Sequence, residues 1–193
     1  MIIFATGGHS KVVFSACAEE VTCFFDDFSE NDSFISKPVF KYDKEIRGSE
    51  KIIIAIGDNF TRKKVAGEIS HSFGIVTDDS ALVDHTVKIG VGSQILQGTI
   101  LQADTIVGQH TIINTGASID HDSIIGDYCH IAPQVTLCGN VTVGEGTIIG
   151  AGSTVIPGIT IGKWSKIGAG SVVTKNIPDN AIAVGNPARV IKS

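Results

Sequence analysis

The sequence lacks several features that would point to other classes of protein. No apolar run reaches membrane-spanning length, and the start Met1-Ile-Ile-Phe-Ala has no charged segment like that of a signal peptide. An excess of basic residues is also absent: 15 Lys and Arg against 20 Asp and Glu give a net charge of -5, which argues against general nucleic-acid binding. We therefore expect a cytoplasmic protein that binds neither membrane nor nucleic acid.

Cysteine is scarce as well, and its spacing is uninformative for metal or disulfide chemistry. The four cysteines are Cys17, Cys23, Cys129 and Cys138, and none belongs to a CxxC pair. This pattern favours neither a zinc site nor a disulfide framework. We expect free, buried or half-buried thiols in a reducing compartment, and no metal site.

What the sequence does contain is an uninterrupted six-residue repeat. Every sixth residue is aliphatic at sixteen consecutive positions: Val83, Ile89, Ile95, Leu101, Val107, Ile113, Ile119, Ile125, Ile131, Leu137, Val143, Ile149, Val155, Ile161, Ile167 and Val173. A glycine directly follows many of these positions. A period of six fits neither a helix nor an open sheet, and it is typical of a β-helix built from short strands and turns.

Three six-residue units are expected to close one triangular coil, so that residues 18 apart lie above one another. The aliphatic positions then fill the interior of the prism. No insertion interrupts the repeat, so no loop projects from the coils to cover a substrate. Substrate recognition must therefore fall to the segment ahead of the repeat and to a neighbouring subunit.

The residues ahead of the repeat predict a small α/β domain at 1–76, followed by a β-helix domain at 77–193. The expected elements are a strand at 2–5, a helix at 11–20, strands at 21–25, 38–40 and 51–56, and a helix at 61–70. Ser10 is the expected N-cap of the first helix, and the first coil is expected to begin at Ala81. This order of elements indicates a Rossmann-like unit.

Ligands of open parallel sheets bind at the carboxyl ends of the strands. This rule gathers one rim of residues: Gly7, Gly8, His9, Asp26, Asp27, Gly57 and Asn59. Asp26 and Asp27 follow the glycine turn by about 20 residues, as the ribose-binding acid of dinucleotide folds does. The third glycine of G-x-G-x-x-G is missing, so NAD is weakly indicated. The turn is either a tight connection or a phosphate site at a helix N-terminus.

One of the six histidines stands out by its neighbours. We interpret His71, His85 and His110 as turn or surface residues. His121 is flanked by Asp120 and Asp122. A carboxylate on one imidazole nitrogen fixes the tautomer and leaves the other nitrogen basic, which makes His121 the candidate general base.

The 18-residue register adds a second group to this candidate site. Gly139 stands one coil above His121, and its N–H has no side chain to shield it from a developing oxyanion. His130 lies nine residues after His121. It could reach the same groove only from a neighbouring edge or a neighbouring subunit.

Across its whole length the chain resembles the left-handed β-helix acyltransferases of the hexapeptide-repeat type. A narrower similarity rests on the glycine turn with His9, the pair Asp26-Asp27, the element 119–122 and the end 185–189. These features together are similar to a branch of that family. The branch contains sialic acid O-acetyltransferases of the NeuD type and bacterial nucleotide-amino-sugar N-acetyltransferases of the PglD type.

The resemblance implies a homotrimer of left-handed β-helices, with an α/β domain carried outside and active sites between subunits. It implies acetyl-CoA as co-substrate in the groove between neighbouring prisms. His121 matches the catalytic base and Asp122 the acid beside it, where the family usually has Glu and where Asp120 could share the role. The positions that match cofactor-binding residues are His130, Gly139, Ala151 and Ala169. The positions that match substrate-binding residues are Gly7, His9, Asp26, Asp27, Gly57, Asn59 and Arg62.

The implied activity is acetyl transfer to the 4-amino group of a nucleotide-linked 4-amino-4,6-dideoxy sugar, with UDP or dTDP as the expected nucleotide. O-acetylation of sialic acid or another sugar hydroxyl is the alternative, because the same base serves a hydroxyl. A non-catalytic β-helix would need no α/β domain, and the threonine row of Thr99, Thr105 and Thr111 is short for surface binding. An NAD-linked oxidoreductase is disfavoured by the missing glycine.

Overall fold

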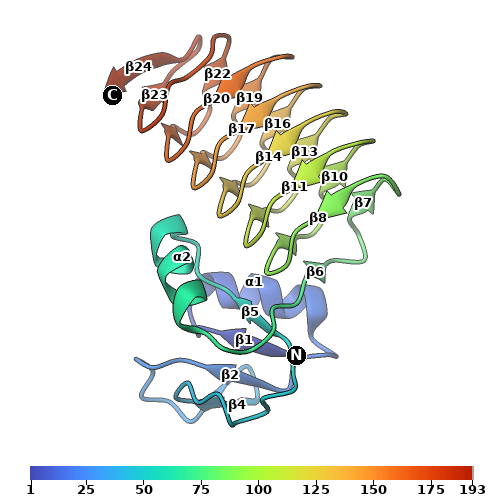
Figure 1. Ribbon diagram of the computed structural model, residues 1–193, viewed down its shortest axis with the longest axis vertical. Coiled ribbons are helices and arrows are strands. Elements are labelled where there is room, and N and C mark those ends of the chain that lie inside the picture. Colours follow the sequence, from blue (N-terminus) through green and yellow to red (C-terminus); the bar gives the residue numbers. More distant parts are fainter. Residues whose placement is uncertain (193) are drawn as a thin grey trace.

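The computed structural model describes residues 1–192 and contains an α/β domain that lies against the first coils of a β-helix (Figure 1). The N-terminus lies in the α/β domain, and the chain ends at the far end of the β-helix (Figure 1). No helix among the described residues is long and apolar enough to cross a membrane. The predicted fold class, α/β followed by a left-handed β-helix, is confirmed.

The α/β domain is built on a five-stranded sheet with the order β3-β4-β2-β1-β5. Its strands are β1 (Ile2–Phe4), β2 (Cys23–Phe25), β3 (Ser33–Phe34), β4 (Lys37–Phe40) and β5 (Ile52–Ile54). Strands β1, β2 and β5 are parallel, and all their side chains are buried. Continuous apolar strands of this kind are typical of a parallel sheet covered on both faces.

The two helices begin earlier than the sequence predicts. Helix α1 (Gly8–Cys17) starts after Gly7, which is its N-cap and offers no side-chain hydrogen bond. Ser10 is therefore not the N-cap; it is fully buried inside the first turn. Helix α2 (Asn59–Glu68) is capped by Asp58, whose carboxylate accepts a hydrogen bond from the N–H of Thr61. The two helix N-termini thus differ, and only that of α2 is closed by a carboxylate.

The β-helix consists of three sheets whose strands run parallel, apart from β24 (Arg189–Lys192), which pairs antiparallel with its neighbour. Sheet 1 contains β7 (Leu82–Val83), β10 (Ile100–Leu101), β13 (Ser118–Ile119), β16 (Thr136–Leu137), β19 (Thr154–Val155) and β22 (Val172–Val173). Sheet 2 contains β8 (Lys88–Ile89), β11 (Ile106–Val107), β14 (Ile124–Ile125), β17 (Thr142–Val143) and β20 (Thr160–Ile161). Sheet 3 contains β6 (Val76–Thr77), β9 (Gln94–Ile95), β12 (Ile112–Ile113), β15 (His130–Ile131), β18 (Ile148–Ile149), β21 (Lys166–Ile167), β23 (Ile182–Val184) and β24 (Arg189–Lys192).

The 18-residue register holds from β6 to β22, where each strand pairs with the strand 18 residues further on, as Ile119 does with Leu137. In the last coil the spacing falls to 16, since Lys166 pairs with Ile182. The aliphatic positions form one continuous core, in which only Val83 and Ile89 are partly exposed. The sheet begins earlier than Ala81, because β6 already pairs with β9. The apolar period therefore accounts for the coil. The first strand has Thr77 at the in-register position, opposite Ile95, and so it gave no aliphatic signal.

Glycines that follow the aliphatic positions serve close stacking rather than left-handed turns. A Cβ on Gly126, for example, would come within 2.7 Å of the backbone nitrogen of Glu145 in the next coil. The left-handed residue lies two positions further along each turn, for instance Asp122 with φ +58° and Gly146 with φ +69°. The glycine excess therefore has two separate steric causes.

The prism has three corners, which we name by the sheets they join. The first corner joins sheet 1 to sheet 2 and includes 120–123 and 138–141. The second corner joins sheet 2 to sheet 3 and includes 108–111, 126–129, 144–147 and 162–165. The third corner joins sheet 3 to sheet 1 and includes 150–153 and 168–171. The α/β domain packs on sheet 3 and the second corner, so the first corner is left open.

Candidate active site

His121 lies on the open first corner, directly after strand β13. Its Nδ1 is 2.7 Å from Oδ2 of Asp122, and its backbone N–H donates to Oδ1 of Asp120 at 2.9 Å. Asp122 is therefore the carboxylate that orients the ring, while Asp120 holds the backbone. The hydrogen bond to Asp122, followed by the charge of Asp120, raises the pKa of His121 above its ordinary value. Because Nδ1 carries the proton toward a carboxylate, the other ring nitrogen, Nε2, is left as the basic atom.

The imidazole of His121 lies against Gly139, as the 18-residue register predicts. A Cβ on residue 139 would come within 2.7 Å of both Cε1 and Nε2 of the ring. Gly139 is thus needed to make room for the ring. The surrounding groove has a volume of about 460 Å³ and is lined by Asp120, His121, Cys138, Gly139, Asn140, Pro157 and Gly158.

Ala151 and Ala169 lie on the third corner, one above the other and both exposed. His121 and Gly139 lie on the first corner, at the opposite edge of sheet 1. The positions that match cofactor contacts in the family are His130, Gly139, Ala151 and Ala169. A single chain therefore does not bring them together. A site that uses both corners needs two copies of the prism.

His130 lies in neither corner but on sheet 3, where it faces the α/β domain. Its Nδ1 is 3.3 Å from the carbonyl oxygen of Gly57, and its Nε2 is 3.0 Å from the amide nitrogen of Asn114. Its ring centre is 6.3 Å from that of His9. Burial, together with the nearby charges of Arg62 and His9, lowers the pKa of His130 to about 4, so it is neutral at pH 7. Within one chain His130 belongs to the domain junction and not to the groove of His121.

His9 is held at the same junction by the β-helix. Its Nε2 is 2.8 Å from Oε1 of Gln94, whose amide in turn donates to the carbonyl of Ile54 at 2.9 Å. Burial lowers the pKa of His9 despite the hydrogen bond that its Nε2 donates to Gln94. Gln94, like Asn114, escaped the sequence analysis. Gln94 lies in the same 18-residue column as His130, and Asn114 directly follows the strand between them. That column was the signal that could have found both residues.

Arg62 is a fully buried side chain that fastens α2 to the second corner. Its guanidinium donates to the carbonyls of His110 (2.8 Å), Ile56 (2.8 Å), Tyr128 (2.9 Å) and Cys129 (3.1 Å). Burial lowers its pKa to about 10, which leaves it charged at pH 7.

Asn59 contributes to the same contact between α2 and the second corner. Its amide nitrogen donates to the carbonyl of Gly146 at 3.0 Å, and its amide oxygen accepts from Arg62 at 2.8 Å. With these partners, Arg62 and Asn59 join the two domains, and the donors of the Arg62 guanidinium are all directed at protein oxygens. Their expected role in substrate binding stays a prediction that this geometry does not favour.

The rim at the carboxyl ends of β1 and β2 carries the open N-terminus of α1. Its first turn contains no acidic residue, and no side chain caps its N–H groups. A Cβ on Gly7 or Gly8 would meet nothing within 4 Å, so the turn faces open space. Backbone N–H groups at an uncapped helix N-terminus form an anion site.

The two aspartates of this rim are bound to their own loop. Asp26 accepts from the N–H and hydroxyl of Thr6 (2.9 and 2.6 Å) and from the N–H groups of Phe28 (2.9 Å) and Ser29 (3.1 Å). Burial acts to raise the pKa of Asp26, but these hydrogen bonds outweigh it and lower the pKa. Asp27 accepts from the N–H of Tyr42 at 2.7 Å. Asp26 therefore organises the rim, and an oxygen of Asp27 is free for a ligand.

Two of the other histidines, which we expected to be turn or surface residues, are buried. His71 is buried and contacts the hydroxyl of Tyr42 and the carbonyl of Ile46. His110 does lie in a turn, but it is only 3% exposed because the α/β domain covers it. His85 is exposed, as predicted. The four cysteines are free thiols, which confirms the prediction for them.

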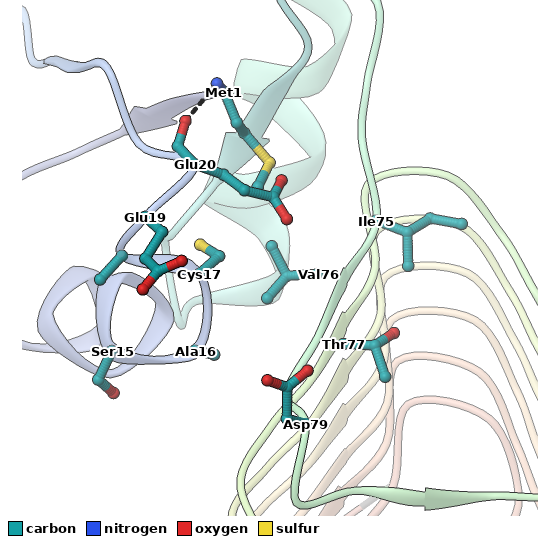
Figure 2. A pocket seen from close by; sticks show the side chains of 11 residues that line it. Met1, Ser15, Ala16, Cys17, Glu19, Glu20, Ile75, Val76, Thr77 and Asp79 are labelled. Carbon is teal, nitrogen blue, oxygen red and sulfur yellow. Dashed lines mark hydrogen bonds between the residues drawn. The ribbon is translucent and has the colours of Figure 1, made fainter.

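A separate cavity of about 640 Å³ lies between the end of α1 and the segment 75–79 (Figure 2). Figure 2 shows Cys17 and Glu20 on one side and Thr77 and Asp79 on the other. The thiol of Cys17 donates to the carbonyl of Val13 at 3.2 Å, and burial raises its pKa to about 11. A thiol in this state is no nucleophile at neutral pH, so catalysis is not assigned to this cavity.

Comparison with known families matches both parts of the chain. Residues 1–69 match the family described as PglD N-terminal domain. Residues 104–139 and 140–175 match the family described as bacterial transferase hexapeptide, six repeats. A comparison with curated proteins gives no match.

Solved structures extend this similarity over the full length. A histidine variant of perosamine N-acetyltransferase from Caulobacter crescentus, in complex with CoA and GDP-perosamine, is 35% identical, with a TM-score of 0.94 and coverage of 100% of this chain and 96% of that one. The acetyltransferase domain of PglB from Neisseria gonorrhoeae is 30% identical, with a TM-score of 0.90 and 98% of both chains covered. WeeI from Acinetobacter baumannii is 26% identical, with a TM-score of 0.91 and 98% of both chains covered.

The six-residue coil, which matches the hexapeptide transferase family, together with the full-length similarity to solved sugar acetyltransferases, defines a hexapeptide-repeat acyltransferase. The small α/β domain narrows this class further, because it matches the N-terminal family along most of its length. The chain belongs to the PglD-like family of sugar acetyltransferases.

Proposed function

We propose that this protein transfers an acetyl group from acetyl-CoA to the 4-amino group of a nucleotide-linked 4-amino-4,6-dideoxy sugar, with His121 as general base. The observation that carries the proposal is the geometry of the His121 ring. Asp122 holds its Nδ1 at 2.7 Å, Gly139 makes room for its other edge, and the groove beside it is open. Relatives with the same two-domain architecture and CoA or acetyl-CoA bound support the choice of donor.

In this mechanism His121 takes a proton through Nε2 as the neutral amine attacks the acetyl thioester. The Asp122 carboxylate stabilises the imidazolium that forms and keeps the productive tautomer. The backbone N–H of Gly139 donates to the oxyanion. When the oxyanion collapses, the C–S bond breaks, and the imidazolium of His121 gives its proton to the sulfur, so that CoA leaves as the thiol. A positioned base of this kind contributes on the order of a hundredfold or more in rate, and orientation of the two substrates contributes further.

We propose a homotrimer in which the active site lies between two subunits. Ala151 and Ala169 on the third corner are separated by sheet 1 from His121 and Gly139 on the first corner. A second prism placed beside the first brings the third corner of one subunit next to the first corner of the other. Ala151 and Ala169 of one subunit then share a CoA-binding groove with His121 and Gly139 of its neighbour. His130 would join them only from another subunit. Light scattering that shows a stable active monomer would contradict this arrangement.

We assign the nucleotide-sugar end to the rim of the α/β domain. The uncapped N-terminus of α1, with Gly7 and His9, suits the diphosphate. Asp27 and the carbonyl of Gly57 lie on the same rim as hydrogen-bond acceptors. UDP or dTDP as the nucleotide stays a prediction, and the complex of the Caulobacter crescentus enzyme with GDP-perosamine, a nucleotide-linked amino sugar, adds GDP to the test.

An acetyl-transfer assay across UDP-, dTDP- and GDP-linked 4-amino sugars tests the proposal. We expect acetyl-CoA-dependent N-acetylation of one nucleotide class, detected by mass spectrometry of the product. Transfer to free sialic acid or to another sugar hydroxyl, with no transfer to any amino sugar, would instead identify an O-acetyltransferase.

The anion site can be tested by closing it. Gly7 has ordinary backbone angles (φ −83°, ψ −173°) and open space at its Cβ, so Gly7→Asp fits without strain. The new carboxylate would cap α1, as Asp58 caps α2, stabilising the protein by roughly a few tenths of a kcal/mol relative to glycine. It would also repel a diphosphate, so we expect KM for the nucleotide sugar to rise about tenfold while KM for acetyl-CoA is unchanged. An unchanged KM for both substrates would place the diphosphate elsewhere.

A further inference from the structure

The loop after β2 presents an aromatic ring to solvent on the rim assigned to the nucleotide sugar. Phe28 is 95% exposed, whereas Phe24 and Phe25 in β2 are fully buried. Strand β2 pairs in parallel with β1, so this loop and the N-terminus of α1 leave the sheet at the same edge. Phe28 therefore stands beside the proposed diphosphate site without packing into the protein.

The loop that carries Phe28 is held from both sides. On one side Oδ1 of Asp26 accepts the N–H groups of Phe28 (2.9 Å) and Ser29 (3.1 Å). On the other side Nζ of Lys41 donates to the carbonyls of Asp27 and Ser29, both at 2.7 Å. The backbone of this loop is therefore ordered before a ligand arrives, so binding loses little backbone conformational entropy.

The chemistry of the ring restricts what it can recognise. Phenylalanine has no hydrogen-bonding group, so it offers nothing to a diphosphate or to sugar hydroxyls. The nucleobase is the flat aromatic part of a nucleotide sugar, and aromatic side chains bind bases by stacking. Strands β2 and β5 both flank β1 at this rim. The exposed ring after β5, Phe60, already lies against Trp164 at 6.3 Å between ring centres, so we assign the base to the β2 side, where the ring of Phe28 is uncovered.

We propose that Phe28 is the stacking platform for the nucleobase and that Asp26 is the positioning residue that presents it. This inference rests on the proposed function and names a specific contact within it. Stacking on a ring is tolerant of the base, because every base has an aromatic face. Phe28 therefore supplies affinity for the nucleotide and does not select among uracil, thymine and guanine.

Calorimetric titration with UMP, dTMP, GMP and ribose 5-phosphate separates the base from the phosphate. We expect Phe28→Ala to bind each of the nucleotides that the wild type binds about tenfold more weakly, and Phe28→Trp to restore the affinity. Ribose 5-phosphate, which has no base, should bind the wild type and Phe28→Ala equally. Leu82→Ala is the matched control, since Leu82 is also an exposed apolar side chain (66%) but begins sheet 1 of the β-helix.

Kinetics provide an independent readout. We expect Phe28→Ala to raise KM for the nucleotide sugar by the same factor as it weakens nucleotide binding, with kcat and KM for acetyl-CoA unchanged. Equal nucleotide affinity in the wild type and Phe28→Ala would overturn the stacking role and leave the proposed function standing. A change of oligomeric state in Phe28→Ala, measured by light scattering, would identify the ring as a subunit contact instead. A wild type that binds none of the nucleotides and acetylates no nucleotide sugar would refute the proposed function itself.

Discussion

Two histidines on two corners of the same prism have opposite environments. His121 on the first corner is exposed, paired with Asp122, and has a raised pKa. His110 on the second corner is 3% exposed, stacks on Tyr128, and has a pKa lowered to about 4, first by burial and then by the charge of Arg62. The repeat builds both corners from the same units. The difference comes from α2, which covers one corner and leaves the other open to substrates.

The comparison teaches that the coil by itself does not decide which corner serves chemistry and which serves stability. Side chains on the covered corner join the domains, and side chains on the open corner are available for chemistry. Substitutions on the open corner should therefore change activity with little effect on stability. Substitutions on the covered corner should do the reverse.

His121→Ala is expected to have the largest effect on activity. Loss of the base should lower kcat by on the order of a hundredfold or more, while acetyl-CoA binding and the melting temperature stay near those of the wild type. His85→Ala is the matched control, because His85 lies two coils below in the same column, also beside an aspartate, Asp84. Wild-type turnover in His121→Ala would show that the base lies elsewhere.

Arg62→Leu tests the covered corner. It removes a buried cation and leaves several carbonyls without a donor, so we expect a loss of about 3–5 kcal/mol in the free energy of unfolding, measured by urea denaturation. Arg47→Leu is the control: Arg47 is half-exposed and pairs with Glu50, and such surface pairs are worth about 1 kcal/mol or less. Equal losses in the two variants would mean that Arg62 does not join the domains.

Gly139→Ala sharpens the comparison on the open corner. The added methyl would overlap the His121 ring, whose atoms lie 2.7 Å from that position, and so displace the base. We expect kcat to fall about tenfold or more from this displacement, with little change in the melting temperature. Gly67→Ala serves as control, because a Cβ there meets nothing within 4 Å. Full activity in Gly139→Ala would show that the ring position seen here is not the productive one.

Asp122→Asn should lower kcat by less than the loss of the base itself, because Nε2 of His121 remains, and should also change the pH dependence. The hydrogen bond to Asp122 raises the pKa of His121, so its loss should lower that pKa. The base works in its neutral form, and the acid limb of kcat/KM should therefore move to lower pH. A shift of this limb to higher pH, or no shift at all, would contradict the assignment of Asp122 as the orienting acid.

Much of the fold followed from periodicity, because core packing repeats wherever the pattern repeats. The sixteen aliphatic positions predicted the coil, its register and the stacking of Gly139 on His121. The start of α1 was misplaced because Ser10, a good N-cap by type, is buried inside the first turn. The buried states of His71 and His110 were missed since the α/β domain, and not the local sequence, removes them from water.

The site was predictable only in part, for a related reason. The flanking aspartates identified His121, but the choice of Asp122 over Asp120 depends on which carboxylate the turn directs at Nδ1. The roles of Arg62 and Asn59 were set by partners 48 to 87 residues away, such as the carbonyls of His110 and Gly146. No local pattern indicates such contacts.

The sequence by itself determined the six-residue repeat, the three-sided coil and the residues that share a column, because these depend on side-chain size at a regular spacing. Tertiary structure decided which corner is covered and which helix N-terminus is open. Those outcomes depend on how α2 docks through Arg62 and on the absence of a capping carboxylate at Gly7. Burial and charge then assign the covered corner to stability and the open corner to chemistry.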